Sequence, residues 1–116
     1  MGNLTTHVLD TATGCPGAGM FIELFRLGGE RTLLTAVTTN SDGRCEGALL
    51  SDEAFRGGEY ELVFHAGDYF SAGGKNLPSP PFLDQVVIRF GVASADQHYH
   101  VPLLISPYGY STYRGS

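Results

Sequence analysis

Short segments of apolar and β-branched residues recur along the chain, and turn-forming residues separate them at intervals of roughly eight to twelve residues. Segments of this length are strands rather than helices, and their regular spacing is typical of a two-sheet sandwich or a barrel. Clear examples are the alternating run EYELVFH and the β-branched run TLLTAVTT. We predict eight strands, over residues 4–9, 20–27, 32–39, 44–49, 59–65, 85–90, 98–105 and 108–114.

The segments between these strands leave room for one helix, which lies between residues 66 and 76 and is kept short by two adjacent glycines. Eight short strands are enough for two sheets packed face to face. We therefore predict an all-β sandwich of two four-stranded antiparallel sheets with one short helix, built from residues 1–116 as a single domain. Pro102 removes a donor from its strand, so we expect an edge position, a bulge or a free N–H side there.

Composition and charge exclude several classes of protein. Hydrophobic residues make up 42% of the chain and charged residues 16%, which fits neither a disordered segment nor a coiled coil. The net charge of -5 argues against nucleic acid and anionic membranes as partners. No apolar run approaches the roughly 20 residues of a membrane helix, and no secretory signal precedes the first strand. We expect a cytoplasmic protein, or a periplasmic one if a leader was removed, with Cys15 and Cys45 as free thiols.

Two of the four histidines stand out as candidates for acid–base chemistry. His98 and His100 are two residues apart in one expected strand, so their side chains share a face, opposite Tyr99. His7 lies on the face of its own strand opposite the core-facing Val8. His7 and His100 both have apolar neighbours, and an imidazole in such a place titrates near physiological pH. We therefore take these two as the candidate acid or base.

A metal site is the competing interpretation of the same histidines. His98 and His100 on one strand face, with His7 nearby, resemble a three-histidine zinc site with one open position. However, a His-x-His spacing also arises by chance in strands, and the chain has neither Cys-x-x-Cys nor Cys-x-x-His. We therefore favour a site without metal. The fourth histidine, His65, ends a strand and is interpreted as structural.

An arginine and the end of the chain supply further polar groups. Arg44 follows the turn NSDGR, where its guanidinium offers a fork of donors suited to a carbonyl oxygen or an oxyanion. The last residues carry the Tyr113 hydroxyl, the Arg114 guanidinium, and at Ser116 a hydroxyl together with the main-chain carboxylate. These groups would be wasted on a frayed terminus, so we expect the chain end to pack against the rest of the protein.

The same segments carry a family resemblance. LTTHVLDTATGCPGAGM near the start, TNSDGR in the middle and HYHVPLLISPYGYSTYRGS at the end resemble the 5-hydroxyisourate hydrolase family of urate degradation in purine metabolism. The resemblance covers essentially the whole chain. The terminal Tyr-Arg-Gly-Ser is specific for this family, and it separates these enzymes from transthyretin, which lacks that ending and both histidines.

This resemblance implies a transthyretin-like sandwich that assembles as a homotetramer, a dimer of dimers with active sites at the dimer–dimer interface. It implies a cofactor-independent cyclic amide hydrolase without metal, whose small-molecule substrate is 5-hydroxyisourate and whose product is 2-oxo-4-hydroxy-4-carboxy-5-ureidoimidazoline. The catalytic positions that match the family are His7, Arg44 and His100. The substrate-binding positions that match are His7, Arg44, Tyr113, Arg114, Gly115 and Ser116. His98 receives no role.

For the reaction, we expect one histidine to take a proton from water as it attacks a ring amide carbonyl, and Arg44 to stabilise the oxyanion. Which of His7 and His100 is the base stays open at this stage. The alternative function is a non-catalytic small-ligand carrier of the transthyretin type, although two histidines and an arginine make a polar site for a hydrophobic ligand. A third possibility, an adhesion or scaffold module, needs no clustered ionisable groups.

Overall fold

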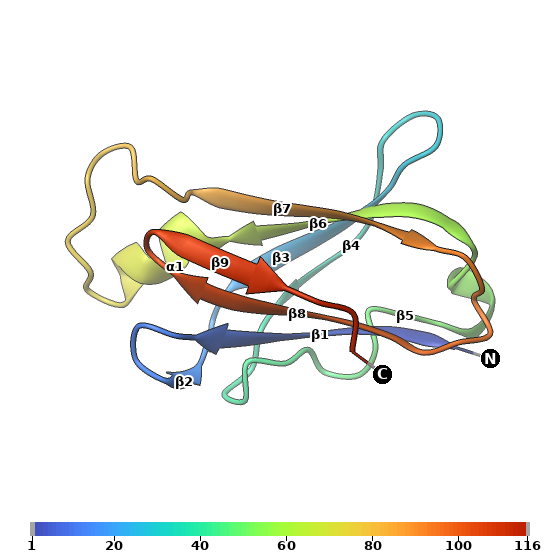
Figure 1. Cartoon of the computed structure of the whole chain (residues 1–116), viewed down its shortest axis with the longest axis horizontal. Coiled ribbons are helices and arrows are strands. Elements are labelled where there is room, and N and C mark those ends of the chain that lie inside the picture. Colours follow the sequence, from blue (N-terminus) through green and yellow to red (C-terminus); the bar gives the residue numbers. More distant parts are fainter. Residues whose placement is uncertain (1, 116) are drawn as a thin grey trace.

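Strands with alternating buried and exposed residues pair into two facing sheets in the computed structural model, which describes residues 2–115 (Figure 1). In these residues the first sheet has five strands in the order β2-β1-β8-β9, with β5 also paired to β1. Its members are β1 (Asn3–Asp10), β2 (Cys15–Pro16), β5 (Leu50–Ser51), β8 (Tyr99–Ser106) and β9 (Gly109–Thr112). The second sheet has the order β4-β3-β6-β7, formed by β3 (Phe21–Arg26), β4 (Thr32–Thr38), β6 (Gly58–His65) and β7 (Gln85–Val92).

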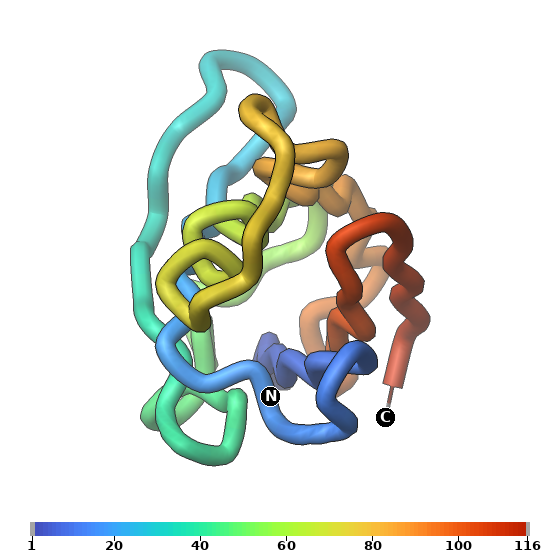
Figure 2. Tube along the Cα trace, turned by 90° about the vertical axis from the view of Figure 1, so that its left-hand side faces the viewer, coloured from blue at the N-terminus to red at the C-terminus, as the bar shows by residue number. Residues whose placement is uncertain are grey.

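The predicted two-sheet sandwich with one short helix is confirmed, and its two layers are visible end-on in Figure 2. The first sheet, however, has five strands instead of the predicted four, because the two-residue strands β2 and β5 both pair with β1. One pairing departs from the predicted antiparallel pattern: β1 and β8 run parallel, from Leu4 opposite Tyr99 to Asp10 opposite Ile105. A parallel pair needs a long crossover, and here the chain between the two strands builds the whole second sheet before it returns.

The predicted strand over residues 44–49 is wrong. Arg44 makes a single bridge to His7, after which the chain turns outward and forms only the two-residue β5. Gly47 has a φ of 76°, a left-handed conformation that a strand does not use, and its neighbours are exposed. The loop expected over residues 10–19 contains the short strand β2. This strand was not predicted, because two residues carry too little of the alternating pattern to be recognised.

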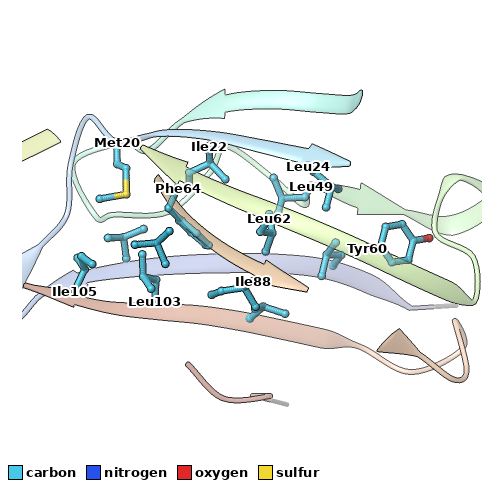
Figure 3. Packing of buried hydrophobic residues seen from close by; sticks show 14 of the residues in the cluster. Met20, Ile22, Leu24, Leu49, Tyr60, Leu62, Phe64, Ile88, Leu103 and Ile105 are labelled. Atoms are coloured by element: carbon cyan, nitrogen blue, oxygen red, sulfur yellow. The ribbon is translucent and has the colours of Figure 1, made fainter. Parts of the chain in front are cut away.

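Side chains that point between the sheets form the core (Figure 3). Along β1 every second residue is buried, and along β8 Tyr99, Val101, Leu103 and Ile105 point inward. Burying one large apolar side chain contributes roughly 1.5–3 kcal/mol, so this alternation fixes which face of each strand looks outward. The residues between the buried ones, His7 and His100 among them, are therefore presented on the outer face of the first sheet.

The helix α1 (Ala66–Ala72) follows β6 directly. Within residues 2–115, no helix is long and apolar enough to cross a membrane.

Pro102 lies in the middle of β8, where its carbonyl accepts a hydrogen bond from the Thr112 hydroxyl at 2.7 Å. The β8–β9 ladder ends at Leu103 and Thr112, so the missing proline donor falls where the pairing stops. This is the free N–H side among the three expected alternatives.

Candidate active site

His7 lies on the outer face of β1, half-buried beside the turn that precedes Arg44. Its Nε2 is 3.0 Å from the carbonyl oxygen of Asp42. Because a carbonyl oxygen only accepts, Nε2 carries the proton and donates it. In the neutral imidazole the free lone pair is therefore on Nδ1. This contact ties the orientation of the His7 ring to the backbone of the turn.

The turn itself is built by Asn40. The Asn40 Oδ1 accepts hydrogen bonds from the backbone N–H groups of Asp42 and Arg44, at 2.9 and 3.1 Å. The backbone N–H of Asn40 donates to the Arg44 carbonyl at 2.8 Å. Gly43 has a φ of 73°, and a Cβ there would collide with the Val8 carbonyl oxygen. The Asp-Gly pair recognised in the sequence is thus required by both backbone conformation and space. It places Arg44 next to His7 on the same face of the sheet.

Arg44 has an exposed side chain, and none of the ion pairs formed within residues 2–115 involves it. Its charge nevertheless acts on His100. The pKa of His100 is lowered, first by burial, then by the positive charges of Arg44, His7 and His98. The structure therefore brings His7, Arg44 and His100 within electrostatic reach of one another, and it keeps His100 neutral at physiological pH. We call these three residues the outer-face triad.

His100 is half-buried, and the end of the chain covers one side of it. Figure 1 shows the chain continuing past the end of β9 and then bending toward the C-terminus, and Gly115 pairs with His100 of β8. The Gly115 N–H donates to the His100 carbonyl at 2.7 Å, and a Cβ at Gly115 would lie 2.9 Å from the His100 Cδ2. Only a glycine allows the backbone to approach the imidazole this closely. Ser116, expected to bind substrate, lies outside the described residues.

Arg114 lies away from the triad. Its guanidinium carbon is 3.9 Å from the centroid of the Tyr99 ring, and its Nη2 donates to the Gln97 Oε1 at 3.0 Å and to the His98 carbonyl at 3.1 Å. Tyr99 points to the core side of β8, whereas His100 points outward. Arg114 therefore fastens the terminal segment to the sandwich by a cation–π contact and two hydrogen bonds.

Tyr113 directly precedes this anchor, and the residue is 59% exposed. It also lines a hollow of about 230 Å³ between β7 and the terminal segment, together with Arg114 and Tyr99. The described contacts thus place the terminus against the sandwich, and they leave the Tyr113 ring accessible.

One residue of the site was missed in the sequence. The Thr5 hydroxyl lies 2.8 Å from the Nδ1 of His100 and 3.3 Å from the Nε2 of His98. Strand alternation puts Thr5 on the same face as His7, which was the available signal, but only the pairing of β1 with β8 shows that it meets His100. Within residues 2–115, no cluster of three or more histidine, cysteine or acidic side chains has the arrangement of a metal site.

Comparisons with known proteins extend these observations. The model of the family described as "HIUase/Transthyretin family" matches residues 4–115. A 5-hydroxyisourate hydrolase from Pseudomonas aeruginosa is 67% identical over 117 residues, which cover 100% of this chain and 93% of that protein. A solved (S)-allantoin synthase superposes with a TM-score of 0.94 at 48% identity; the match covers 99% of this chain, which spans 44% of that one.

The fold is also shared with sea bream transthyretin, solved in complex with thyroxine, at a TM-score of 0.87 and 23% identity over 97% of this chain and 94% of that one. Fold and outer-face triad together define a transthyretin-like sandwich with a polar, imidazole-rich site. The chain belongs to the HIUase/Transthyretin family, and the family resemblance predicted from its motifs is confirmed.

Proposed function

We propose that this protein hydrolyses 5-hydroxyisourate in urate degradation and yields 2-oxo-4-hydroxy-4-carboxy-5-ureidoimidazoline. The chain is a hydrolase by its relatives, several of which are named for this substrate and match over nearly their whole length. The observation that carries the proposal is the outer-face triad, which gathers two imidazoles and a guanidinium on one face without a compensating carboxylate among residues 2–115.

His100 is the better candidate for the base. Its lowered pKa keeps the imidazole neutral at physiological pH, so one ring nitrogen is free to accept a proton from the attacking water. Such assistance typically accelerates a reaction by about 100- to 10,000-fold. His7, whose Nε2–H is used on the turn backbone, retains Nδ1 as an acceptor that orients the water or the substrate.

Arg44 holds the negative charge that develops on the ring carbonyl oxygen. Its guanidinium is exposed on the outer face and carries donors only, so it suits an oxyanion rather than a cation. Loss of one oxyanion donor commonly lowers kcat by about 100- to 1,000-fold. The reaction needs a positioned water, a base and this donor, and the proposed steps use no cofactor.

The terminal segment shapes the pocket. Gly115 packs against the His100 ring, and Arg114 anchors the segment from the far side. In this proposal Tyr113 contacts the substrate, and Arg114 contributes by holding the segment that carries Tyr113 in place. A substrate contact of Ser116, which lies outside the described residues, stays part of the proposal. The role of Arg114 differs from the direct contact expected for it in the sequence, because its guanidinium is already engaged.

The site is open in a single copy, which supports an assembly in which a second copy completes it. Arg44 and Tyr113 are exposed, and His7 and His100 are only half-buried on the outer face of the sheet. We propose a homotetramer, a dimer of dimers whose dimer–dimer interface covers this face and excludes water from the triad. Analytical ultracentrifugation with matched activity assays tests this directly, and an active monomer would contradict it.

The experiment for the function is a spectroscopic assay with freshly generated 5-hydroxyisourate. The protein is expected to accelerate ring opening well beyond the spontaneous rate, and a variant that lacks residues 113–116 is expected to lose this activity while its circular dichroism stays unchanged. A protein that leaves the spontaneous rate unaltered, yet binds a hydrophobic hormone-like ligand, would instead be a carrier.

A further inference from the structure

The Thr5 hydroxyl lies between two imidazoles. Because β1 and β8 pair in parallel with Thr5 directly opposite His100, the two side chains are nearest neighbours on the outer face of the sheet. The Thr5 Oγ1 is 2.8 Å from the His100 Nδ1 and 3.3 Å from the His98 Nε2. Thr5 is half-buried, and Thr5 and His100 lie in paired strands, so their contact does not depend on a loop; His98 lies just before β8 and is exposed.

A hydroxyl has one proton, so Thr5 can donate to one of these nitrogens and must accept from the other if both contacts are hydrogen bonds. If it donates to the His100 Nδ1, neutral His100 carries its own proton on Nε2, and that nitrogen cannot act as a base. If it accepts from the His100 Nδ1–H, the lone pair is left on Nε2. The direction of these two hydrogen bonds therefore decides whether the Nε2 of neutral His100 carries a proton, as an acid, or a free lone pair, as a base.

We propose that Thr5 is a positioning residue: its hydroxyl accepts the Nδ1–H of His100, donates to the Nε2 of His98, and so leaves the Nε2 of His100 as the base. This inference rests on the proposed function, since only this order gives His100 a proton acceptor on the side away from Thr5. It also gives His98 a role, that of the acceptor that orients the Thr5 hydroxyl. His98 is exposed, so water satisfies its other nitrogen in either order.

The surroundings of His100 are compatible with this order. The charged and titratable groups that act on it are Arg44, His7 and His98. Arg44 has donors only and provides no acceptor for an Nε2–H. Gly115 packs on the Cδ2 edge of the ring, next to Nε2. A glycine has no side chain, so Gly115 places no competing side-chain group beside this nitrogen.

The direct test is ¹⁵N-detected NMR of the histidine side chains, at a pH where His100 is neutral. Wild type is expected to show His100 as the Nδ1–H tautomer. Thr5→Val keeps the branched shape and removes the hydroxyl, and it should shift His100 toward the Nε2–H tautomer that free histidine prefers. Thr5→Ser should retain the wild-type tautomer. Thr38→Val, the same change on β4 of the second sheet, is the matched control and should leave the His100 signals unmoved.

Kinetics provide the second readout. Partners that orient metal-bound histidines are worth roughly 10- to 100-fold in activity. We expect a loss of about the same order in kcat for Thr5→Val, with little change in KM, and Thr5→Ser should restore most of it. His98→Gln, whose side-chain oxygen can still accept from Thr5, should stay closer to wild type than His98→Leu. The Thr5 and His98 variants should change kcat and not KM, because neither substitution removes a proposed contact with the substrate.

The outcomes separate this inference from the function on which it rests. An Nε2–H tautomer for His100 in wild type, or a Thr5→Val variant with unchanged tautomer and kcat, overturns the positioning role even if the hydrolase activity is confirmed. Wild type without activity refutes the proposed function, while the NMR result still decides whether Thr5 sets the tautomer.

Discussion

The outer faces of the two sheets both present histidines and arginines, but they treat the charges in opposite ways. On the second sheet Glu61 is held by Arg31 and Arg89, with N–O distances of 2.7 and 2.8 Å, and His65 is 2.7 Å from a carboxylate oxygen of Glu23. The Glu61 side chain is only 3% exposed, whereas those of Arg31 and Arg89 are 50% and 72% exposed. Each cationic or basic group on this face therefore has an acidic partner.

The outer-face triad of the first sheet has no such partner among residues 2–115. Its imidazoles are oriented by neutral groups, a backbone carbonyl for His7 and a hydroxyl for His100. Neutral partners orient a ring without neutralising charge, so the positive potential of Arg44 stays available to an incoming anion or oxyanion. The same residue types therefore differ by their partners: the basic groups of the second sheet are paired with carboxylates and are structural, whereas the basic groups proposed to be functional are not paired.

The largest expected effect separates histidines on the two faces. His100→Asn and His7→Asn should each lower kcat/KM by about 100- to 10,000-fold, because the first removes the base and the second removes the group that orients the water or the substrate. His65→Asn, on the other sheet, is the matched control and should keep near-normal activity. Steady-state rates for the three variants check this, and near-normal rates for both His7→Asn and His100→Asn would show that the base lies elsewhere.

The next effect separates two arginines. Arg44→Gln should lower kcat by about 100- to 1,000-fold, because the oxyanion donor is lost. It should also raise the pKa of His100, since the Arg44 charge is one of the causes of its depression. Arg89→Gln, which removes a partner of Glu61 on the other sheet, should leave kcat close to wild type. If the two variants lose activity equally, the contrast between the faces has no catalytic meaning.

A smaller effect, on stability, is expected at Glu61. Burial raises the pKa of this carboxyl, but hydrogen bonds and charges of Arg31 and Arg89 outweigh burial, and the net pKa is lowered. Glu61→Gln should lower the free energy of unfolding by about 1.5–3 kcal/mol, the range for hydrogen bonds to charged groups, with activity retained.

Because the folded pKa of Glu61 is depressed, its ionised form stabilises wild type above the unfolded pKa of about 4.3, and this contribution is lost as pH falls. Urea unfolding of wild type and Glu61→Gln at several pH values measures it. A difference between the two proteins that does not shrink toward acid pH would contradict the ion-pair explanation.

The smallest expected effect is a shift in pH dependence. The depressed pKa of His100 means that the base stays unprotonated below the ordinary histidine value of about 6.5, so the acid limb of kcat/KM should lie below that value. Arg44→Gln should move the limb upward. A wild-type limb at or above 6.5 would mean that His100 is not the titrating base.

Much of the site followed from strand alternation. A period of two predicted that Val8 faces the core and that Tyr99 lies on the face opposite His100. Both Val8 and Tyr99 are buried, so His7 and His100 lie on the outer face. The Asp-Gly signal also located the turn that carries Arg44. These features depend on local pattern and backbone conformation, which a single sequence contains.

Other features depend on pairing between distant strands and could not be derived locally. Thr5 meets His100 only because β1 and β8 are parallel and in one particular register, whereas an antiparallel pair was expected. Arg114 lies between the Leu103–Thr112 pair and the His100–Gly115 bridge, and this register places it on the face of Tyr99. The register of the chain end on β8 is a long-range property that local pattern does not contain. The predicted strand over 44–49 was wrong because a glycine in a left-handed conformation interrupts it.

The proposed function requires that the uncompensated basic groups on the outer face of the first sheet bind the substrate. A structure of the assembled protein with a stable purine analogue bound is the decisive measurement. We expect the analogue to lie against Arg44, His7 and His100, with the terminal residues of the chain beside it and a second copy covering the face. An analogue bound away from this face, or an assembly that leaves the three residues in bulk water, would contradict it.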